Sequence, residues 1–329
     1  MFDLDLDSAV SWIKNRGYGS VAVQLPEGLK MSALGISDFL SGSAGVAVTV
    51  LGDPCYGACD LFSDYRKYAD ALIHFGHSPI HPQENDEDIL FVEVRANPDI
   101  DVYLAAVSQK LPQKIGLLAT VQYVGLIPNA KKILERDGKT VFVGRGDSRI
   151  FHQGQVLGCN FSAAESVNDE VDAFLYIGEG DFHPLAAAFG TDKDVVVFNP
   201  LTGDIKSVKE IRDRILRKRF AAIETAKNAE TFLVIVCTKT GQDRSALADS
   251  VAGKIRERGK KAYILLANEI GPDVLLPYNV DAYVNTACPR IVMDDSAKYK
   301  KPMLTVTEAE IVLGLREWER YEFDSITSC

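Results

Sequence analysis

Long apolar runs are missing from this chain of 329 residues, and so is a basic, apolar leader. The longest apolar stretches, such as residues 232–237, have the length of a β-strand and fall far short of the roughly 20 residues that span a bilayer. Residues 1–14 are acidic and lack the basic start and apolar core of an export signal. We therefore expect a cytoplasmic protein that makes no contact with membranes.

An excess of positive charge is also missing, because 36 Lys and Arg residues stand against 46 Asp and Glu residues, a net charge of −10. Non-specific binding of nucleic acid is therefore not expected. Residues 206–227 are a local exception, since Lys and Arg alternate there with Ile and Phe in the pattern of an amphipathic helix. A solvated basic face explains this pattern, and docking of a partner protein or of RNA is the alternative.

Nucleotide-binding loops are missing too. The glycine-rich segment 144–158 lacks the Lys-Ser/Thr pair of a P-loop, and no G-x-G-x-x-G opens a helix after a first strand. Residues 178–180, Gly-Glu-Gly, are interpreted as a turn. These absences argue against hydrolysis of nucleoside triphosphates.

Short, continuous apolar runs alternate with helical patterns along the whole chain. Continuous apolar runs are typical of parallel strands whose two faces are both covered, and this alternation predicts layers of α/β structure. Helices are expected at 127–136, 208–226 and 244–258. The expected strands are 20–24, 46–51, 71–75, 114–119, 140–143, 173–177, 195–198, 232–237, 262–266 and 282–285.

Three segments, 69–80, 171–185 and 280–291, share one pattern: an Asp and an Ala, an apolar strand, a loop with His, Cys or Gly, and a Pro. About 50 residues before each lies another strand that ends in a polar loop. We predict an α/β protein of three related parallel-sheet modules, an internal triplication around a pseudo-threefold centre. The modules are expected at 1–110, 111–228 and 229–329, and chance similarity among Val-, Ala- and Asp-rich strands is the alternative.

Three of the six cysteines follow strands in different modules, namely Cys59, Cys159 and Cys288. Ligands of parallel sheets sit beyond the carboxyl ends of the strands, so these thiols converge if the three modules pack with those edges inward. Three thiolates can hold zinc or an iron–sulfur cluster, and the lack of a C-x2-C pair favours the cluster. Three unrelated buried thiols are the plain alternative.

The other cysteines are interpreted differently. Cys237 ends an apolar strand and is expected to be a small buried hydrophobe, and Cys329 is expected to be frayed. Cys55 forms a C-x3-C pair with Cys59, so the sequence pattern leaves a ligand role open for it.

A family resemblance enters at these cysteines. The segments GDPCYGACD, GCNFSA and NTACPRI, around Cys59, Cys159 and Cys288, resemble the three cysteine motifs of the archaeal 2-(3-amino-3-carboxypropyl)histidine synthase family of diphthamide biosynthesis. QLPEGL and GEGDFHPL are similar to further segments of the family. The resemblance runs from about residue 18 to about residue 316.

The resemblance implies three α/β modules around one [4Fe-4S] cluster, with Cys59, Cys159 and Cys288 as ligands and Cys55 not among them. It implies a transferase that cleaves S-adenosylmethionine (SAM) at the reduced cluster and adds the 3-amino-3-carboxypropyl radical to a histidine of translation elongation factor 2. Methylthioadenosine is the by-product. The C-x3-C-x2-C loop of the usual radical SAM enzymes is absent, because position 62 is Phe.

Residues that could hold the methionine part of SAM lie in the strand-end loops. No catalytic residue beyond the cluster ligands is predicted, and Arg290 is the preferred contact, because a guanidinium binds a carboxylate with two hydrogen bonds. The other candidates are Gln24, Glu27, Gln242 and Asp243, with His77, Asp147 and His183 near predicted loops.

The resemblance also implies a homodimer and an electron donor. Two rival functions remain open at this point. One is a dehydratase similar to quinolinate synthase, which has three α/β modules and a three-cysteine cluster. The other is a non-catalytic, cluster-bearing electron-relay subunit.

Overall fold

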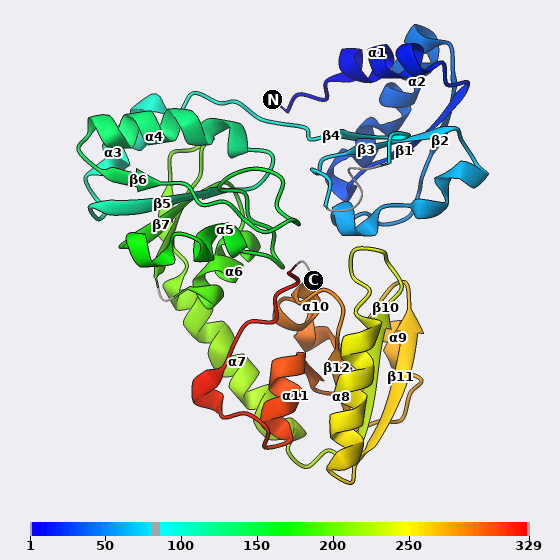
Figure 1. Ribbon diagram of the computed structural model, residues 1–329, viewed down its shortest axis with the longest axis vertical. Helices are drawn as coiled ribbons and strands as arrows, with labels where there is room; N and C mark the ends of the chain where they lie inside the picture. The colour runs from blue at the N-terminus through cyan, green and yellow to red at the C-terminus, as the bar shows by residue number, and fades with distance from the viewer. Residues whose placement is uncertain (1, 81–85, 192, 328–329) are drawn as a thin grey trace.

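The computed structural model describes the chain except for residues 1, 81–85, 192 and 328–329. Three lobes meet near the middle of the molecule, and each is built on its own β-sheet with helices packed against it (Figure 1). The expected α/β class with three parallel-sheet modules is confirmed. Within the described residues, no helix combines the length and apolar character needed to span a membrane.

The first sheet has the strand order β2-β1-β3-β4, and all its neighbours are parallel. Helices α1 and α2 pack together, and their apolar side chains share one core with strands β1 and β3. The elements are α1 (Leu6–Arg16), β1 (Ser20–Gln24), α2 (Ala33–Ala44), β2 (Ala47–Val50), β3 (Ala71–Phe75) and β4 (Ile89–Val92).

The second sheet has the order β6-β5-β7-β8-β9, in which only the β8–β9 pair is antiparallel. Its two faces are covered by separate apolar clusters. The elements are α3 (Asp101–Ser108), β5 (Lys114–Ala119), α4 (Ile127–Arg136), β6 (Thr140–Phe142), α5 (Ser162–Glu165), β7 (Ala173–Ile177), α6 (Phe182–Gly190), β8 (Asp194–Phe198) and β9 (Ile205–Ser207).

The third sheet has the order β11-β10-β12-β13 and is entirely parallel. The long helix α7 leads into it from the second lobe. The elements are α7 (Lys209–Ala226), β10 (Thr231–Cys237), α8 (Ser245–Glu257), β11 (Lys261–Ala267), α9 (Pro272–Leu275), β12 (Ala282–Asn285), α10 (Arg290–Met293), β13 (Met303–Leu304) and α11 (Val306–Val312).

The repeated Asp of the three similar segments has the same role in each lobe. It precedes the third strand, and its carboxylate accepts a hydrogen bond from the backbone N–H at the start of the first strand, a donor that the sheet leaves unpaired. These bonds, of 2.8–2.9 Å, run from Ser20 to Asp70, from Lys114 to Asp172 and from Thr231 to Asp281. Together with the common strand order, this shared contact supports an internal triplication.

Two expectations from the sequence need correction. Helix α3 falls inside the expected first module, 1–110, but Leu104 and Val107 pack in the core of the second sheet, so this helix belongs with the second lobe. Arg219, counted on the basic face of segment 206–227, is 1% exposed and forms an ion pair with Glu308 at 2.6 Å. The solvated basic face of α7 therefore excludes Arg219.

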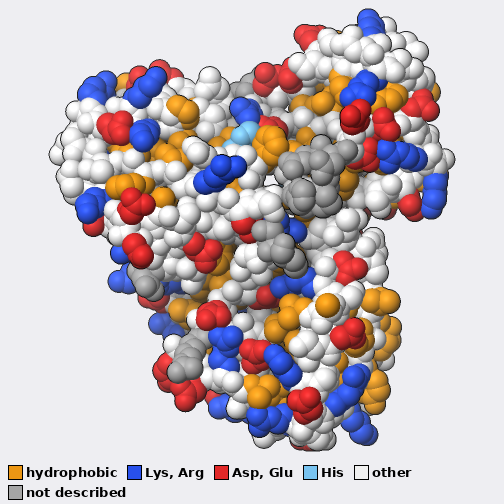
Figure 2. Space-filling view, in the orientation of Figure 1, with side chains coloured by type: hydrophobic (Ala, Val, Ile, Leu, Met, Phe, Trp, Pro, Cys, Tyr) orange, Lys and Arg blue, Asp and Glu red, His pale blue; other side chains and the backbone are white. Residues whose placement is uncertain are grey.

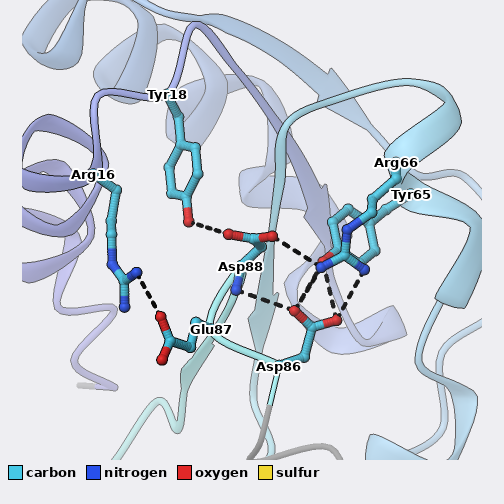
Figure 3. Close-up of polar contacts among 7 residues, drawn as sticks. All are labelled: Arg16, Tyr18, Tyr65, Arg66, Asp86, Glu87 and Asp88. Carbon is cyan, nitrogen blue, oxygen red and sulfur yellow. Dashed lines mark hydrogen bonds and ion pairs between the residues drawn. The ribbon is translucent and has the colours of Figure 1, made fainter.

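An ionic network fixes the approach to β4 in the first lobe (Figure 3). The Arg66 guanidinium bonds to Asp86 at 2.7 Å and to Asp88 at 2.9 Å, and the Tyr18 hydroxyl donates to Asp88 at 2.7 Å. These contacts hold the acidic segment just before Ile89, so β4 enters the sheet in register with β3.

We expect Arg219→Met to lower the free energy of unfolding by about 3–5 kcal/mol, because the buried Glu308 carboxylate loses its cation. Chemical denaturation measures this loss. Lys227→Met, which removes the exposed ion pair of α7 with Glu224, is the control and costs less than about 1 kcal/mol. Adding Glu308→Gln to Arg219→Met restores part of the loss, and an Arg219→Met protein as stable as the control contradicts the assignment.

Candidate active site

One cavity of about 180 Å³ lies where the three lobes meet, and loops from all three line it. Cys59 lies in the loop after β2, Cys159 follows the long loop after β6, and Cys288 follows β12. Arg290 and Gln242 line the same cavity. The strand-end loops of different lobes thus bring together three cysteines that stand about a hundred residues apart in the sequence.

The three cysteines are half-buried at the cavity surface, and desolvation raises the pKa of each thiol. For Cys59 the Asp60 carboxylate and the other two sulfurs raise the pKa further, and for Cys288 the pKa reaches about 12. The sulfurs therefore lie close enough for the charge on one to raise the pKa of another. A cationic centre bound between them would offset this cost, because metals bind the thiolate form.

The loop after β10 packs directly on Cys59. The Gly241 N–H donates to the Cys59 carbonyl at 3.3 Å, and a Cβ on Gly241 would lie 2.5 Å from the Cys59 Cα. Only a residue without a side chain allows this approach of the third lobe to the first.

The chain end holds the other two cysteine loops in place. Arg244 donates to the Ala287 carbonyl at 2.9 Å and pairs with both Asp324 oxygens, at 2.7 and 2.8 Å. The Ile326 N–H donates to the Cys159 carbonyl at 2.7 Å. The segment around residues 324–326 therefore joins the loops of the second and third lobes.

Two histidines present unprotonated rings at the cavity wall. The pKa of His77 and of His183 is lowered to about 4, mainly by burial, and the Arg290 charge contributes to the shift of His183. Behind His77, the His74 Nε2 lies 2.9 Å from the His77 Nδ1, and the His74 Nδ1 lies 2.9 Å from the Gln24 Oε1. Because Gln24 Oε1 only accepts, His74 Nδ1 carries the proton, His77 Nδ1 donates, and His77 Nε2 remains an acceptor.

A second set of possible ligands lies beside this histidine pair. Cys55, His74 and His77 offer ligand atoms that all lie within 4.8 Å of one another, a set that could hold a metal ion. The Cys55 thiol donates to the Gly57 carbonyl at 3.8 Å, and the histidines bond to each other. The Cys55 thiol and three of the four histidine ring nitrogens thus have hydrogen-bond partners within the protein.

Two arginines bring positive charge to the cavity. The Arg290 guanidinium stacks over the Phe182 ring at 5.0 Å and bonds to Asp294 at 2.9 Å. Arg149 donates to the Gly241 carbonyl at 3.1 Å, and its buried Nε has no hydrogen-bond partner within the described residues. Arg149 also lowers the pKa of Cys159 against the effect of burial.

Arg149 was not among the residues predicted from the sequence, although it lies in the loop that leads to Cys159. Of the predicted SAM contacts, Arg290, Gln242, His77 and His183 line the cavity. Gln24 lies behind the wall with its amide engaged by His74 and Phe62, so it makes no direct contact. Glu27, Asp243 and Asp147 lie outside the lining: Glu27 pairs with Lys30, Asp243 accepts from the Ser245 N–H, and Asp147 from Asn160.

Comparison with known proteins decides the family. The family model of diphthamide synthesis proteins matches residues 25–323. The chain belongs to this family. It is 38% identical to the 2-(3-amino-3-carboxypropyl)histidine synthase of Pyrococcus horikoshii, over 95% of this chain and 91% of that protein. It is 28% identical to the synthase of Methanocaldococcus jannaschii, over 99% and 94% of the two chains.

A solved structure agrees with these relatives. The crystal structure of Dph2 from Pyrococcus horikoshii with a 4Fe-4S cluster superposes with a TM-score of 0.89 at 36% identity, covering 99% of this chain and 95% of that one. Subunit 1 of the Schizosaccharomyces pombe synthase is 29% identical, over 98% of this chain and 76% of that subunit. The resemblance stated from the cysteine motifs is confirmed.

The donor set of the cavity fits an iron–sulfur cluster. Cysteine thiolates are the usual protein ligands of such clusters, and three half-buried cysteines line one cavity here. Arg149 and Arg244 place positive charge beside Cys159, which offsets the negative charge of bound thiolates.

We expect Gly241→Ala to prevent cluster loading, because the added methyl group would collide with the Cys59 backbone and move the loop after β10 away. Iron and sulfide analysis after anaerobic reconstitution measures the loss. Gly253→Ala in α8 is the control, since nothing lies within 4 Å of a Cβ there. Normal iron content in the Gly241→Ala protein would rule out this close approach.

We expect the cluster-free protein to lose stability as the pH falls from about 6.5 to about 4. The pKa of His77 and of His183 is about 4 when folded, against about 6.5 when unfolded, so the unfolded chain binds more protons in this interval. Above about pH 6.5 the contribution is fully present. Thermal midpoints across this range measure it, and His77→Gln and His183→Gln each flatten the dependence; equal slopes in all three proteins refute the neutral-ring assignment.

Proposed function

We propose that this chain is a 2-(3-amino-3-carboxypropyl)histidine synthase, a transferase that carries one [4Fe-4S] cluster. It moves the 3-amino-3-carboxypropyl group from SAM to a histidine of translation elongation factor 2, the first step of diphthamide biosynthesis. The observation that carries this function is the convergence of three cysteines, one from each lobe, on a single cavity. The synthase names of its relatives and the cluster in the Dph2 structure support it.

Cys59, Cys159 and Cys288 would hold the cluster, and Cys55 would not. When bound, the cluster supplies the electron that breaks the carbon–sulfur bond of the sulfonium. The protein's own contribution is an apolar lining, to which Phe182, Leu157 and Ile80 belong. Apolar side chains around the reacting group would limit its contact with water and so its quenching.

Arg290 would hold the carboxylate of the methionine part of SAM. Its guanidinium faces the cavity beside Cys288, and stacking on Phe182 fixes its plane. The neutral rings of His77 and His183 offer acceptors for the ammonium group of the same moiety, because their low pKa keeps them unprotonated near pH 7. Carboxylate and ammonium would thus meet groups of opposite character in one cavity.

The assembly of the protein is part of the proposal. The three lobes are related by a pseudo-threefold axis through the cavity, with module boundaries close to 111 and 229 except for α3. The active protein is a cytoplasmic homodimer that receives electrons from a separate donor.

Charges of both signs are interspersed over the lobes on the face in Figure 2. The exposed basic residues of α7 would form a local basic surface at which elongation factor 2 docks.

We expect Cys59→Ala, Cys159→Ala and Cys288→Ala each to abolish the [4Fe-4S] spectrum and to lower bound iron and sulfide. Cys55→Ala is the matched control and keeps the cluster. The reduced wild-type protein incubated with SAM yields methylthioadenosine, and the single chain modifies elongation factor 2 without a partner subunit.

Each rival function has its own signature in this experiment. Inert SAM in a loaded, reduced protein favours a dehydratase similar to quinolinate synthase. Failure of the purified chain to modify elongation factor 2 unless a second subunit is added favours a relay subunit. Loss of the cluster in Cys55→Ala would overturn the ligand set.

A further inference from the structure

The side chain of Gln242 reaches from the third lobe to a cysteine of the first. Its Nε2 lies 3.3 Å from the Cys59 Sγ and 3.2 Å from the Asp60 Oδ1, and the residue is 6% exposed. A side-chain amide nitrogen carries two hydrogens, so both are directed at these two acceptors. Gln242 is thus a buried donor to the sulfur of a residue that the proposed function assigns to the cluster.

The surroundings decide which end of the amide faces the sulfur. The Lys239 ammonium, which only donates, lies 3.1 Å from the Asp60 Oδ1, so this oxygen is an acceptor. The Tyr56 N–H donates to the other carboxylate oxygen. With an acceptor on this side, the nitrogen of Gln242, and not its oxygen, must point toward Asp60 and Cys59.

The backbone holds Gln242 in the same place. The Gln242 N–H donates to the Lys239 carbonyl at 2.9 Å, closing a turn whose Gly241 packs against the Cys59 backbone. Lys239 in turn bonds to Glu269 at 2.6 Å and lies over the Tyr56 ring at 5.3 Å. The donor is therefore positioned by contacts on both sides of the boundary between the first and third lobes.

We propose that Gln242 raises the reduction potential of the bound cluster by donating a hydrogen bond to the Cys59 sulfur, with Asp60 and Lys239 orienting its amide. This inference rests on the proposed function. Reduction adds negative charge to a cluster and its sulfurs, and a donor stabilises the more negative state more strongly. Gln242 acts through Cys59, so it is a positioning residue and not a catalytic one.

The test is a redox titration of the loaded, SAM-free protein followed by electron paramagnetic resonance. In Gln242→Leu the midpoint shifts to lower potential, and in Gln242→Glu, which replaces a donor with a carboxylate, it shifts further. Gln122→Leu is the matched control: Gln122 lines the same cavity but donates to the Gly76 carbonyl at 2.6 Å, so its loss leaves the midpoint unchanged. An unchanged midpoint in both Gln242 variants overturns the proposal, including when their affinity for SAM falls, since Gln242 would then serve the co-substrate.

If the Gln242 variants do not load a cluster, a second measurement on the wild-type holoprotein tests the same hydrogen bond. Pulsed resonance of the reduced protein, labelled with 15N in the glutamine side chains, shows a weak nitrogen coupling that persists in Gln122→Leu. Absence of that coupling contradicts the hydrogen bond. A wild-type protein that never assembles a [4Fe-4S] cluster defeats the proposed function instead, so the two failures are distinguishable.

Discussion

The structure depends on one constraint: three separate sheets must direct the loops at the ends of their strands to the same point. Each sheet places its first strand between the second and the third, so equivalent loops leave equivalent edges. The contact of Gly241 with the Cys59 backbone shows how closely two of these edges approach. A cavity built in this way draws its chemistry from distant parts of the chain, and no local motif contains it.

The cavity is costly for the protein to maintain, because the thiols and the rings of His77 and His183 lose hydration there. The cost is reduced in two ways. Histidines remain neutral and bond to each other, as His74 and His77 do, and thiols remain protonated through burial. Arg149 keeps a buried Nε that has no hydrogen-bond partner in the part of the chain that the structure describes. Such a group is stabilised by an anionic occupant, which is the charge that bound thiolates or a carboxylate would supply.

The sequence predicted most of the central strands, because each is a continuous apolar run bounded by turns; β1, β3, β5, β7 and β12 have the expected bounds. It missed β4 and β13, which are short strands at sheet edges, and β9, the antiparallel addition. The sequence predicted that Cys59, Cys159 and Cys288 converge, because each follows a strand in a different module, and all three line one cavity. The polar contacts were harder: Gln24 ends strand β1 and Gln242 lies in the loop after β10, yet Gln24 lies behind the wall and Gln242 on it. That difference depends on tertiary packing around each side chain, and local sequence patterns do not predict this packing.

Ligands from three lobes also link binding to assembly. If all three cysteines belonged to the same loop, a metal centre could form in a single folded module. Here the donor set exists only when all three lobes are docked, so a bound centre stabilises the docked arrangement, and loosening of any lobe weakens the site. The ion pair of Arg244 with Asp324 and the hydrogen bond from Ile326 to the Cys159 carbonyl also favour the docked arrangement, since both hold lobes together at the cavity. The scattered cysteines therefore make the integrity of the whole fold a condition for reactivity.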